Sequence, residues 1–217
     1  MDNILKLSNK KRIKLAKDPN TSAKTLEVLA EDSQVRSYVA ENPNTSAETL
    51  NVLATDVDYN VRSYVVRNPN TSQETLAILA TDEDHHVRWV VARNPNTSQE
   101  TLKVLATDED SYVRCWVTKN PNTPQEILKL LATDKVINVR SHVVRNPNTS
   151  AEILTILATD EEYFVRSWVA RHPSTPPEIL AVLATDGDLD VRSYAAHNPN
   201  SSELIRRIYL MTCADFA

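Results

Sequence analysis

Apolar residues recur along this chain at helical spacing, in short blocks that are separated by Asn-Pro steps. One such block, residues 42–67, reads NPNTSAETLNVLATDVDYNVRSYVVR. Within it, Leu50, Leu53 and Ala54 stand at positions i, i+3 and i+4, which places them on one face of a helix. The first half of the block is therefore predicted to form an amphipathic helix.

The second half of the block has an apolar face of its own. Val61 and Val65 are four residues apart and are expected to point inward from a shorter helix over roughly 58–67. Pro69 disfavours helical geometry at Asn68, so the helix should end there. Because this helix is short and no glycine caps it, its length is compatible with partial 3₁₀ geometry.

The first helix of the block carries a start signal. Thr45 stands where an N-cap is expected, and Glu48, three residues later, completes a capping box. The same pair recurs in later blocks as Thr71 with Glu74, Thr97 with Glu100, Thr123 with Glu126, Thr149 with Glu152 and Thr175 with Glu178. Pro124 and Pro176 follow the threonine in two blocks and suit the first helical position, where a missing N–H costs nothing.

These blocks are copies of a tandem repeat. The prolines of the Asn-Pro-like steps are Pro19, Pro43, Pro69, Pro95, Pro121, Pro147, Pro173 and Pro199. The first interval is 24 residues and each later interval is 26. A Val-Arg pair keeps the same period, with arginines at Arg36, Arg62, Arg88, Arg114, Arg140, Arg166 and Arg192.

A single copy cannot bury the apolar faces of its two helices, whereas stacked copies bury a continuous core. We therefore predict one all-α domain over residues 1–217, a solenoid of about seven 26-residue repeats with alternating long and short helices. Residues 1–18 are expected to form a degenerate N-terminal cap, 19–200 the repeats and 201–217 a C-terminal cap helix.

The repeat resembles the leucine-rich repeat variant family, whose units read NPxTPxExLxxLAxDxxxxVRxxV. The resemblance covers essentially the whole chain and implies a right-handed superhelix of α-helices and 3₁₀-type helices without strands. The repeat is also similar to HEAT repeats in its Asp-to-Arg spacing of six, as between Asp56 and Arg62. That resemblance implies a ladder of these two residues between neighbouring units. The N-terminal cysteines that hold an iron–sulphur cluster in the founding variant protein are missing here, so no cluster is carried over.

The composition of the chain argues against several classes of function. The net charge of −5 argues against a protein that coats nucleic acid, and Gly187, the single glycine, cannot supply a Gly-rich phosphate-binding loop. Cys115 and Cys213 have no zinc-binding spacing, which favours a reducing compartment. The N-terminus lacks the apolar run of a signal peptide, and no apolar stretch is as long as a membrane span. We expect a cytoplasmic monomer without metal or cofactor.

Two columns of variable residues lie on the second helix of the repeat. Two residues after each ladder arginine come Tyr38, Tyr64, Val90, Trp116, His142, Trp168 and Tyr194, with Trp89 displaced by one. Three residues further come Glu41, Arg67, Arg93, Lys119, Arg145, Arg171 and His197. The aromatic residues either pack between units or contact a partner. The basic residues are either paired with the capping glutamates, as Arg67 with Glu74 and Arg93 with Glu100, or open to an acidic or extended ligand.

The connection between the two helices also varies, and it is acidic and rich in aromatic residues. Its copies are residues 57–60, 83–86, 109–112, 135–138 and 161–164. These loops are either solvated or form a rim that contacts a ligand. His85 and His86 beside Asp84 are not predicted to bind metal, because adjacent side chains should point apart and no further ligand recurs at i+4. Cys115 has no histidine partner that would make it a catalytic thiol.

The Asp–Arg pair recurs seven times and is interpreted as scaffold, since a catalytic pair is needed once. We therefore predict a non-catalytic scaffold that binds a protein or peptide through its concave face and loop rim. The candidate partner-binding residues are Tyr64, Arg67, Trp89, Arg93, Trp116, Lys119, His142, Arg145, Trp168 and Arg171. The alternative is nucleic-acid binding through the basic column, and a glycosylase-like activity has only analogy of fold behind it.

Overall fold

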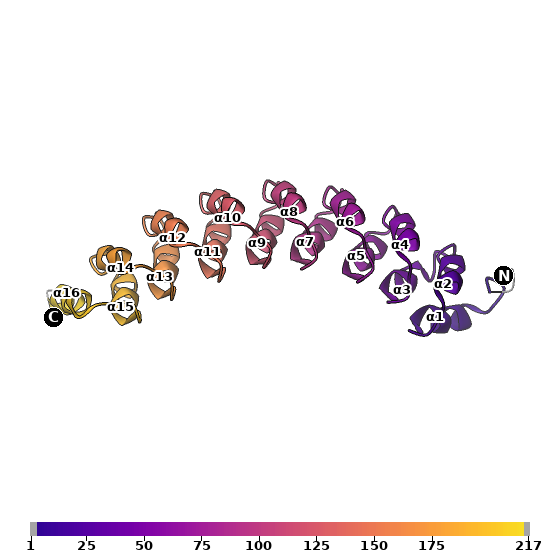
Figure 1. The fold of residues 1–217 in the computed structure, drawn as a ribbon, viewed down its shortest axis with the longest axis horizontal. Helices are drawn as coiled ribbons and strands as arrows, with labels where there is room; N and C mark the ends of the chain where they lie inside the picture. The colour runs from indigo at the N-terminus through magenta and orange to yellow at the C-terminus, as the bar shows by residue number, and fades with distance from the viewer. Residues whose placement is uncertain (1–3, 215–217) are drawn as a thin grey trace. The chain divides into compact units, whose positions relative to one another are not determined.

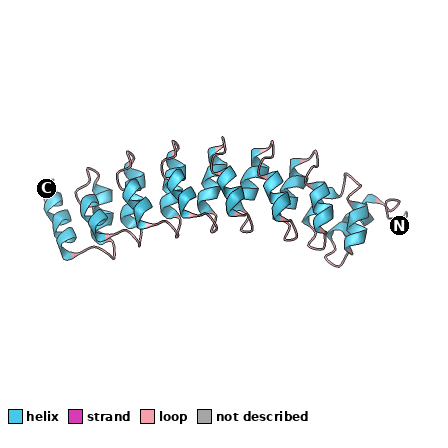
Figure 2. Ribbon diagram, turned by 45° about the horizontal axis from the view of Figure 1, so that its top comes forward, coloured by secondary structure: helices cyan, strands magenta, loops and turns pink. Residues whose placement is uncertain are grey.

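A computed structural model describes residues 4–214, with side chains described to residue 211. The chain divides into two compact units, Met1–Asn122 and Thr123–Ala217. Figure 2 shows helices joined by loops, and the described residues contain no strand. The ends of both predicted caps, residues 1–3 and 215–217, and the side chain of Cys213 lie outside the described part. No helix of the described residues is long and apolar enough to cross a membrane.

Each unit is a series of helix pairs. The helices of the first unit are α1 (Asn9–Lys17), α2 (Ala23–Leu29), α3 (Arg36–Glu41), α4 (Ala47–Leu53), α5 (Tyr59–Arg67), α6 (Gln73–Leu79), α7 (His85–Arg93), α8 (Gln99–Leu105) and α9 (Ser111–Lys119). Those of the second unit are α10 (Gln125–Leu131), α11 (Ile137–Arg145), α12 (Ala151–Leu157), α13 (Tyr163–Arg171), α14 (Pro177–Leu183), α15 (Leu189–His197) and α16 (Glu203–Ala214).

Within each unit the odd-numbered helices up to α15 form one row and the even-numbered helices up to α14 form another (Figure 1). Each odd-numbered helix packs against the next one of its unit, as α5 does against α7 and α13 against α15. The predicted inward residues Leu50, Leu53, Ala54, Val61 and Val65 are all buried between the rows. Full burial of a leucine or valine contributes about 1.5–3 kcal/mol, so the repeated core is the main source of stability. The all-α repeat fold is confirmed.

The predicted order of helix lengths was wrong. The even-numbered helices from α2 to α14, which open the repeats, have seven residues, whereas the odd-numbered helices from α5 to α15 have nine and are α-helical. The opening helix ends early at Leu53, and the Thr55 hydroxyl turns back to the Val52 carbonyl at 3.0 Å. The N-cap of the second helix is Asp58, whose carboxylate accepts the Asn60 N–H. The helix continues to Arg67, directly before the Asn-Pro step.

The predicted capping box was also wrong, by one position. The N-cap is Ser46, whose hydroxyl accepts the Thr49 N–H at 3.2 Å, while the Thr45 hydroxyl donates to the carbonyl of Val39 at 2.5 Å. Pro124 and Pro176 correspondingly occupy the N-cap, and Pro177 takes the first helical position. Threonine and serine are both good N-caps. Thr45 does not cap the helix because its hydroxyl donates instead to the buried carbonyl of Val39, six residues earlier.

An arginine–aspartate ladder joins successive repeats, as the resemblance to HEAT repeats implied. In the first unit, Arg62 donates through Nε and Nη2 to the carboxylate of Asp82 at 2.6 and 2.8 Å, and through Nη1 to the carbonyl of Asp56. Equivalent pairs are Arg88 with Asp108, Arg140 with Asp160 and Arg166 with Asp186. The hydrogen bond to Asp82 raises the pKa of Arg62. The guanidinium fork fits two carboxylate oxygens at once, which a lysine cannot do.

The ladder extends into the N-terminal cap. Arg12 lies 2.5 Å from Asp32 through its Nε, and Arg36 lies 2.6 Å from Asp56 through its Nη1. Arg12 takes the place of the ladder arginine in a segment where charge replaces the apolar residues of later repeats. The segment predicted to be the N-terminal cap therefore keeps the ladder connection to the repeat that follows it, although it carries charge where later repeats are apolar.

The asparagine of each Asn-Pro step forms a second ladder, which points the opposite way along the chain. The side-chain amide of Asn68 donates to the carbonyls of Ala40 and Asn42 in the preceding repeat, at 2.7 and 2.8 Å. Its oxygen accepts the Asn70 N–H at 3.0 Å, which bends the chain locally. The amides that donate in this way belong to Asn42, Asn68, Asn94, Asn120 and Asn198.

His172 interrupts the asparagine ladder. It stands in the place of the asparagine, is only 9 % exposed, and accepts the Ser174 N–H on Nδ1 at 3.1 Å. Burial lowers the pKa of His172, against an opposing hydrogen bond with the backbone of Asn146. The folded chain therefore holds this ring neutral at a pH where the unfolded chain takes up a proton.

Replacing His172 with asparagine is expected to raise the free energy of unfolding by about 1 kcal/mol at neutral pH, because the amide supplies two donors where the neutral ring supplies one. The wild-type chain should lose further stability as the pH falls below about 6.5, the window in which only the unfolded state is protonated. Urea unfolding of both proteins at pH 7.5 and 5.5 measures this. His197→Asn, at an exposed position, is the control, and an equal pH dependence of the wild type and His172→Asn would contradict the expectation.

Candidate interaction surface

The aromatic and basic residues that were predicted to form two columns lie together on the odd-numbered helices of the first unit. Trp116 is the best surrounded: the Arg93 guanidinium lies 5.1 Å and the Lys119 ammonium 4.6 Å from its ring centroid. Trp89 stacks on Trp116 with ring centroids 5.6 Å apart. The displacement of Trp89 by one position therefore leaves it within the aromatic column.

The same unit holds two simpler pairs. Arg67 lies over the ring of Tyr64 at 5.8 Å, and Lys17 lies over the ring of Tyr38 at 4.3 Å. The sequence reasoning missed Lys17, because the repeat is irregular at its start. The sequence does indicate that Lys17 belongs to the basic column, since Lys17 follows Arg12 by five residues, as Arg67 follows Arg62.

In the second unit the cations and rings alternate. Trp168 has the guanidinium of Arg145 at 4.7 Å and that of Arg171 at 4.9 Å, and Arg171 also lies 4.8 Å from the ring of Tyr194. His142 is half-buried on α11, at the repeat position of Trp168. In both units, therefore, a cation contacts the ring of its own repeat, the ring of the next repeat, or both. We call these residues the cation–aromatic stripe of each unit.

The stripe shows how the basic residues are paired on the surface of each unit. Arg67, Arg93, Lys119, Arg145 and Arg171 are exposed, whereas the tryptophans are half-buried. The arginines thus stack on aromatic rings. The capping carboxylate of Glu74 instead interacts with its own backbone N–H and the Ser72 hydroxyl, which lower its pKa. Stacking of this kind is worth about 0.5–1 kcal/mol at an exposed site and orders the guanidinium plane.

Two cavities open between adjacent odd-numbered helices at equivalent places. One, of about 360 Å³, is lined by Arg67, Arg93 and Trp89 together with the prolines of two Asn-Pro steps. The other, of about 390 Å³, is lined by Arg145, Arg171 and Trp168 and by the equivalent prolines, Pro147 and Pro173. The arginines and prolines of the two cavities are 78 residues apart, which is three repeats. Each unit therefore contains a recess in which two arginines flank a tryptophan.

The residues predicted to form the connecting loops lie next to the stripe, but the last two of each set belong to the first turn of the following helix, as Tyr59 and Asn60 do in α5. We call these connections, with those first-turn residues, the loop rim. Tyr112 meets Trp89 edge to face at 6.5 Å, and Phe164 meets Trp168 in the same way at 6.2 Å. Tyr59 and Tyr163 are exposed. These contacts extend the aromatic surface from the second helix into the rim. Cys115 is buried in α9.

A second exposed column was not predicted. The residue before the final leucine of each even-numbered helix is apolar and more than half exposed at Val52, Ile78, Val104, Leu130 and Val182. The signal in the sequence is an apolar residue that recurs directly before each Leu-Ala pair, off the inward face. This column lies on the other row of helices and serves below as a control surface.

Comparison with known proteins supports the repeat assignment. The model of the leucine-rich repeat variant domain matches residues 138–199, and that of the leucine-rich repeat variant matches residues 59–84. A solved structure described as "a leucine-rich repeat variant with a novel repetitive protein structural motif" matches with a TM-score of 0.67 and 25% identity, over 87% of this chain and 80% of that chain. Residues 59–84 and 138–199 thus match the leucine-rich repeat variant family, and the chain resembles that family in its repeat and in its fold. The predicted resemblance and its helical-repeat scaffold are thereby confirmed.

Other comparisons add no weight to this leucine-rich repeat variant assignment. An engineered protein matches with a TM-score of 0.42 and 19% identity, over 92% of this chain and 72% of that chain. A second engineered protein matches with a TM-score of 0.29 and 17% identity, over 95% of each chain. No curated protein matches the chain.

Proposed function

We propose that this helical-repeat protein is a non-catalytic scaffold that binds an acidic, extended segment of a protein partner along the cation–aromatic stripe. The observation that carries the proposal is the stacking of exposed arginines on half-buried tryptophans, as in Arg145 and Arg171 on Trp168. A stacked guanidinium still points its N–H groups outward in its own plane. That edge matches the two oxygens of a carboxylate.

The repeat supports an extended partner in particular. Adjacent packed helices are about 8–10 Å apart, and an extended chain advances about 3.3–3.6 Å per residue. Roughly three residues of the partner therefore pass each repeat. We expect carboxylates at every third position of the bound segment, each facing the arginine of one repeat, while other side chains enter the recesses beside Trp89 or Trp168.

Nucleic acid fits the same surface less well. Proteins that bind single strands stack bases on exposed aromatic rings, whereas the ring of Trp168 already contacts two guanidinium groups and that of Trp116 contacts two cations and Trp89. The neighbouring rim carries exposed carboxylates at Glu83 and Glu109. With the net charge of −5, these groups repel a phosphate backbone, which carries one charge per nucleotide, more than a segment with one carboxylate in every three residues.

The test is a binding titration with a labelled peptide that carries aspartate at every third position. Arg145→Ala with Arg171→Ala is expected to weaken binding at least about tenfold, equivalent to about 1.4 kcal/mol. Fluorescence anisotropy at physiological salt measures the dissociation constant. A peptide of the same composition with its aspartates clustered should bind more weakly to the wild-type protein.

Lys103→Ala with Lys129→Ala is the matched control, because it removes the same charge from exposed positions on the even-numbered helices. An equal loss in both double variants would show that net charge alone drives binding and would overturn the proposal. Loss of binding on substitution of Val104 and Leu130, with the arginine variant unaffected, would place the partner on the other row. Tighter binding of single-stranded DNA than of the peptide, lost in the arginine variant, would establish the nucleic-acid alternative.

A further inference from the structure

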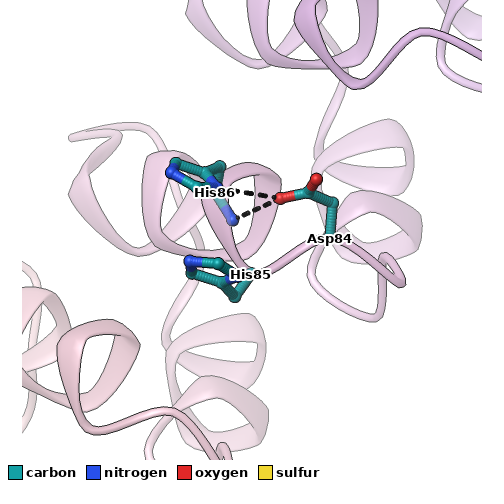
Figure 3. Close-up of side chains that lie close together, drawn as sticks. All are labelled: Asp84, His85 and His86. Atoms are coloured by element: carbon teal, nitrogen blue, oxygen red, sulfur yellow. Dashed lines mark hydrogen bonds and ion pairs between the residues drawn. The ribbon is translucent and has the colours of Figure 1, made fainter.

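Asp84, His85 and His86 gather at the start of α7, and the proposed function uses none of them. Their ligand atoms, the ring nitrogens and a carboxylate oxygen, all lie within 4.8 Å of one another. The two imidazole rings are 4.2 Å apart between centroids. Figure 3 shows both rings on the same side of the helix start, with the Asp84 carboxylate reaching toward His86. The expectation that adjacent side chains would point apart was therefore wrong.

The helix start explains this convergence. Asp84 is the N-cap of α7, and its Oδ1 accepts the backbone N–H of His86 at 2.8 Å and approaches His86 Nδ1 at 3.2 Å. Capping turns the carboxylate back over the first helical turn, above the side chain two residues later. Two consecutive residues in that first turn are His85 and His86. The sequence reasoning treated the segment as an ordinary loop or helix and overlooked the capping geometry.

These three groups are a suitable ligand set for a late first-row divalent ion. Imidazole nitrogens and a carboxylate are common ligands of Zn²⁺ and Cu²⁺, with bonds of about 2.0–2.2 Å, so that neighbouring donors lie roughly 3.4 Å apart. The widest separation must therefore shrink by roughly 1.4 Å, and rotation of exposed side chains between rotamers can supply this. His85 and His86 are both exposed, and the His86 ring lies 5.8 Å from the ring of Tyr59, which is itself exposed.

The arrangement occurs in one repeat. The corresponding positions after the capping aspartate are Tyr59 and Asn60 in the preceding repeat and Ser111 and Tyr112 in the following one. A feature that packing required would recur at the repeat period, as the arginine–aspartate ladder does. The histidine pair departs from the repeat pattern at exposed positions that packing constrains little. The residues at the same positions of the neighbouring repeats are suitable replacements in a test.

We propose that Asp84, His85 and His86 form a surface site for one Cu²⁺ or Zn²⁺ ion. The two imidazoles and the carboxylate provide three ligands, and the remaining coordination positions face solvent at the loop rim. Cu²⁺ should bind more tightly than Zn²⁺, following the general order of divalent affinities.

The test is isothermal titration of the untagged protein with CuCl₂ and with ZnCl₂ at pH 7.5. We expect one ion per chain at this site, with Cu²⁺ bound more tightly than Zn²⁺. His85→Ser with His86→Tyr installs the pair of the following repeat and should abolish the site with the fold retained by circular dichroism. Electron paramagnetic resonance of the Cu²⁺ form should show nitrogen ligands that this double variant lacks.

Asp84→Asn keeps a good helix cap and removes the charged ligand, so it should weaken binding by at least about tenfold. Asp110→Asn makes the same change at the next repeat, where no histidine follows, and should leave the affinity unchanged. Absence of a bound ion at pH 7.5 would overturn the proposal. So would an unchanged affinity in the double variant, which would assign the binding to other histidines of the chain.

Discussion

Replacing Arg88 with alanine is expected to lower the free energy of unfolding by about 3–5 kcal/mol, because it leaves a buried carboxylate without its cation. Arg88 makes two hydrogen bonds to Asp108, at 2.6 and 3.0 Å, and a third to the carbonyl of Asp82 at 2.9 Å. The side chain of Asp108 is 7% exposed, so water cannot take the place of the guanidinium. Urea unfolding followed by circular dichroism measures the loss.

Arg93→Ala is the matched control for this prediction, since it removes an exposed arginine from the same helix. Its cation–π contact with Trp116 is worth about 1 kcal/mol or less. Arg88→Lys should fall between the two, because it keeps the charge and loses the fork. Equal destabilisation by Arg88→Ala and Arg93→Ala would show that the ladder contributes nothing beyond surface electrostatics.

The second large effect is expected from Asn68→Ala, at about 3 kcal/mol of destabilisation. Asn68 is 4% exposed, and alanine leaves the carbonyls of Ala40 and Asn42 and the N–H of Asn70 without their buried partner. Each buried polar group that loses its partner carries a desolvation cost. The same urea experiment reports the change, and hydrogen exchange of the Asn70 amide should become faster.

The neighbouring Asn70→Ala provides a comparison within one turn. Asn70 also donates to the preceding repeat, to Pro43 and Thr45, but it is exposed and water can replace those bonds. Its loss should cost about 1 kcal/mol or less. If Asn70→Ala is as damaging as Asn68→Ala, burial is not what makes the asparagine ladder strong.

The sequence predicted the features that follow from periodicity. The 26-residue period, the buried Leu50 and Val65, and the end of α5 before Pro69 depend only on apolar spacing and on the stereochemistry of proline. The pairing of arginine with aspartate followed from a resemblance that also depends on spacing. Such features could be predicted because every copy of the repeat shows the same residues at the same spacing.

Features that depend on the offset between repeats could not be predicted. Thr45 and Ser46 are equivalent as caps by sequence, and the carbonyl of Val39 decides between them. The amide of Asn68 reaches carbonyls 26 and 28 residues earlier, which have no signature in the sequence. In the stripe, the aromatic and basic columns follow from the repeat period, but the pairing of a cation with a ring 23 residues later depends on how one repeat sits on the next.

The two ladders have opposite directions, and this has a consequence for the length of the protein. In the first unit, two successive repeats reach forward through Arg62 and Arg88 and backward through Asn68 and Asn94. Excision or duplication of 26 residues thus joins surfaces that already fit each other. Such a chain can grow or shrink by whole repeats, and the cation–aromatic stripe would lengthen or shorten with it while the fold stays the same.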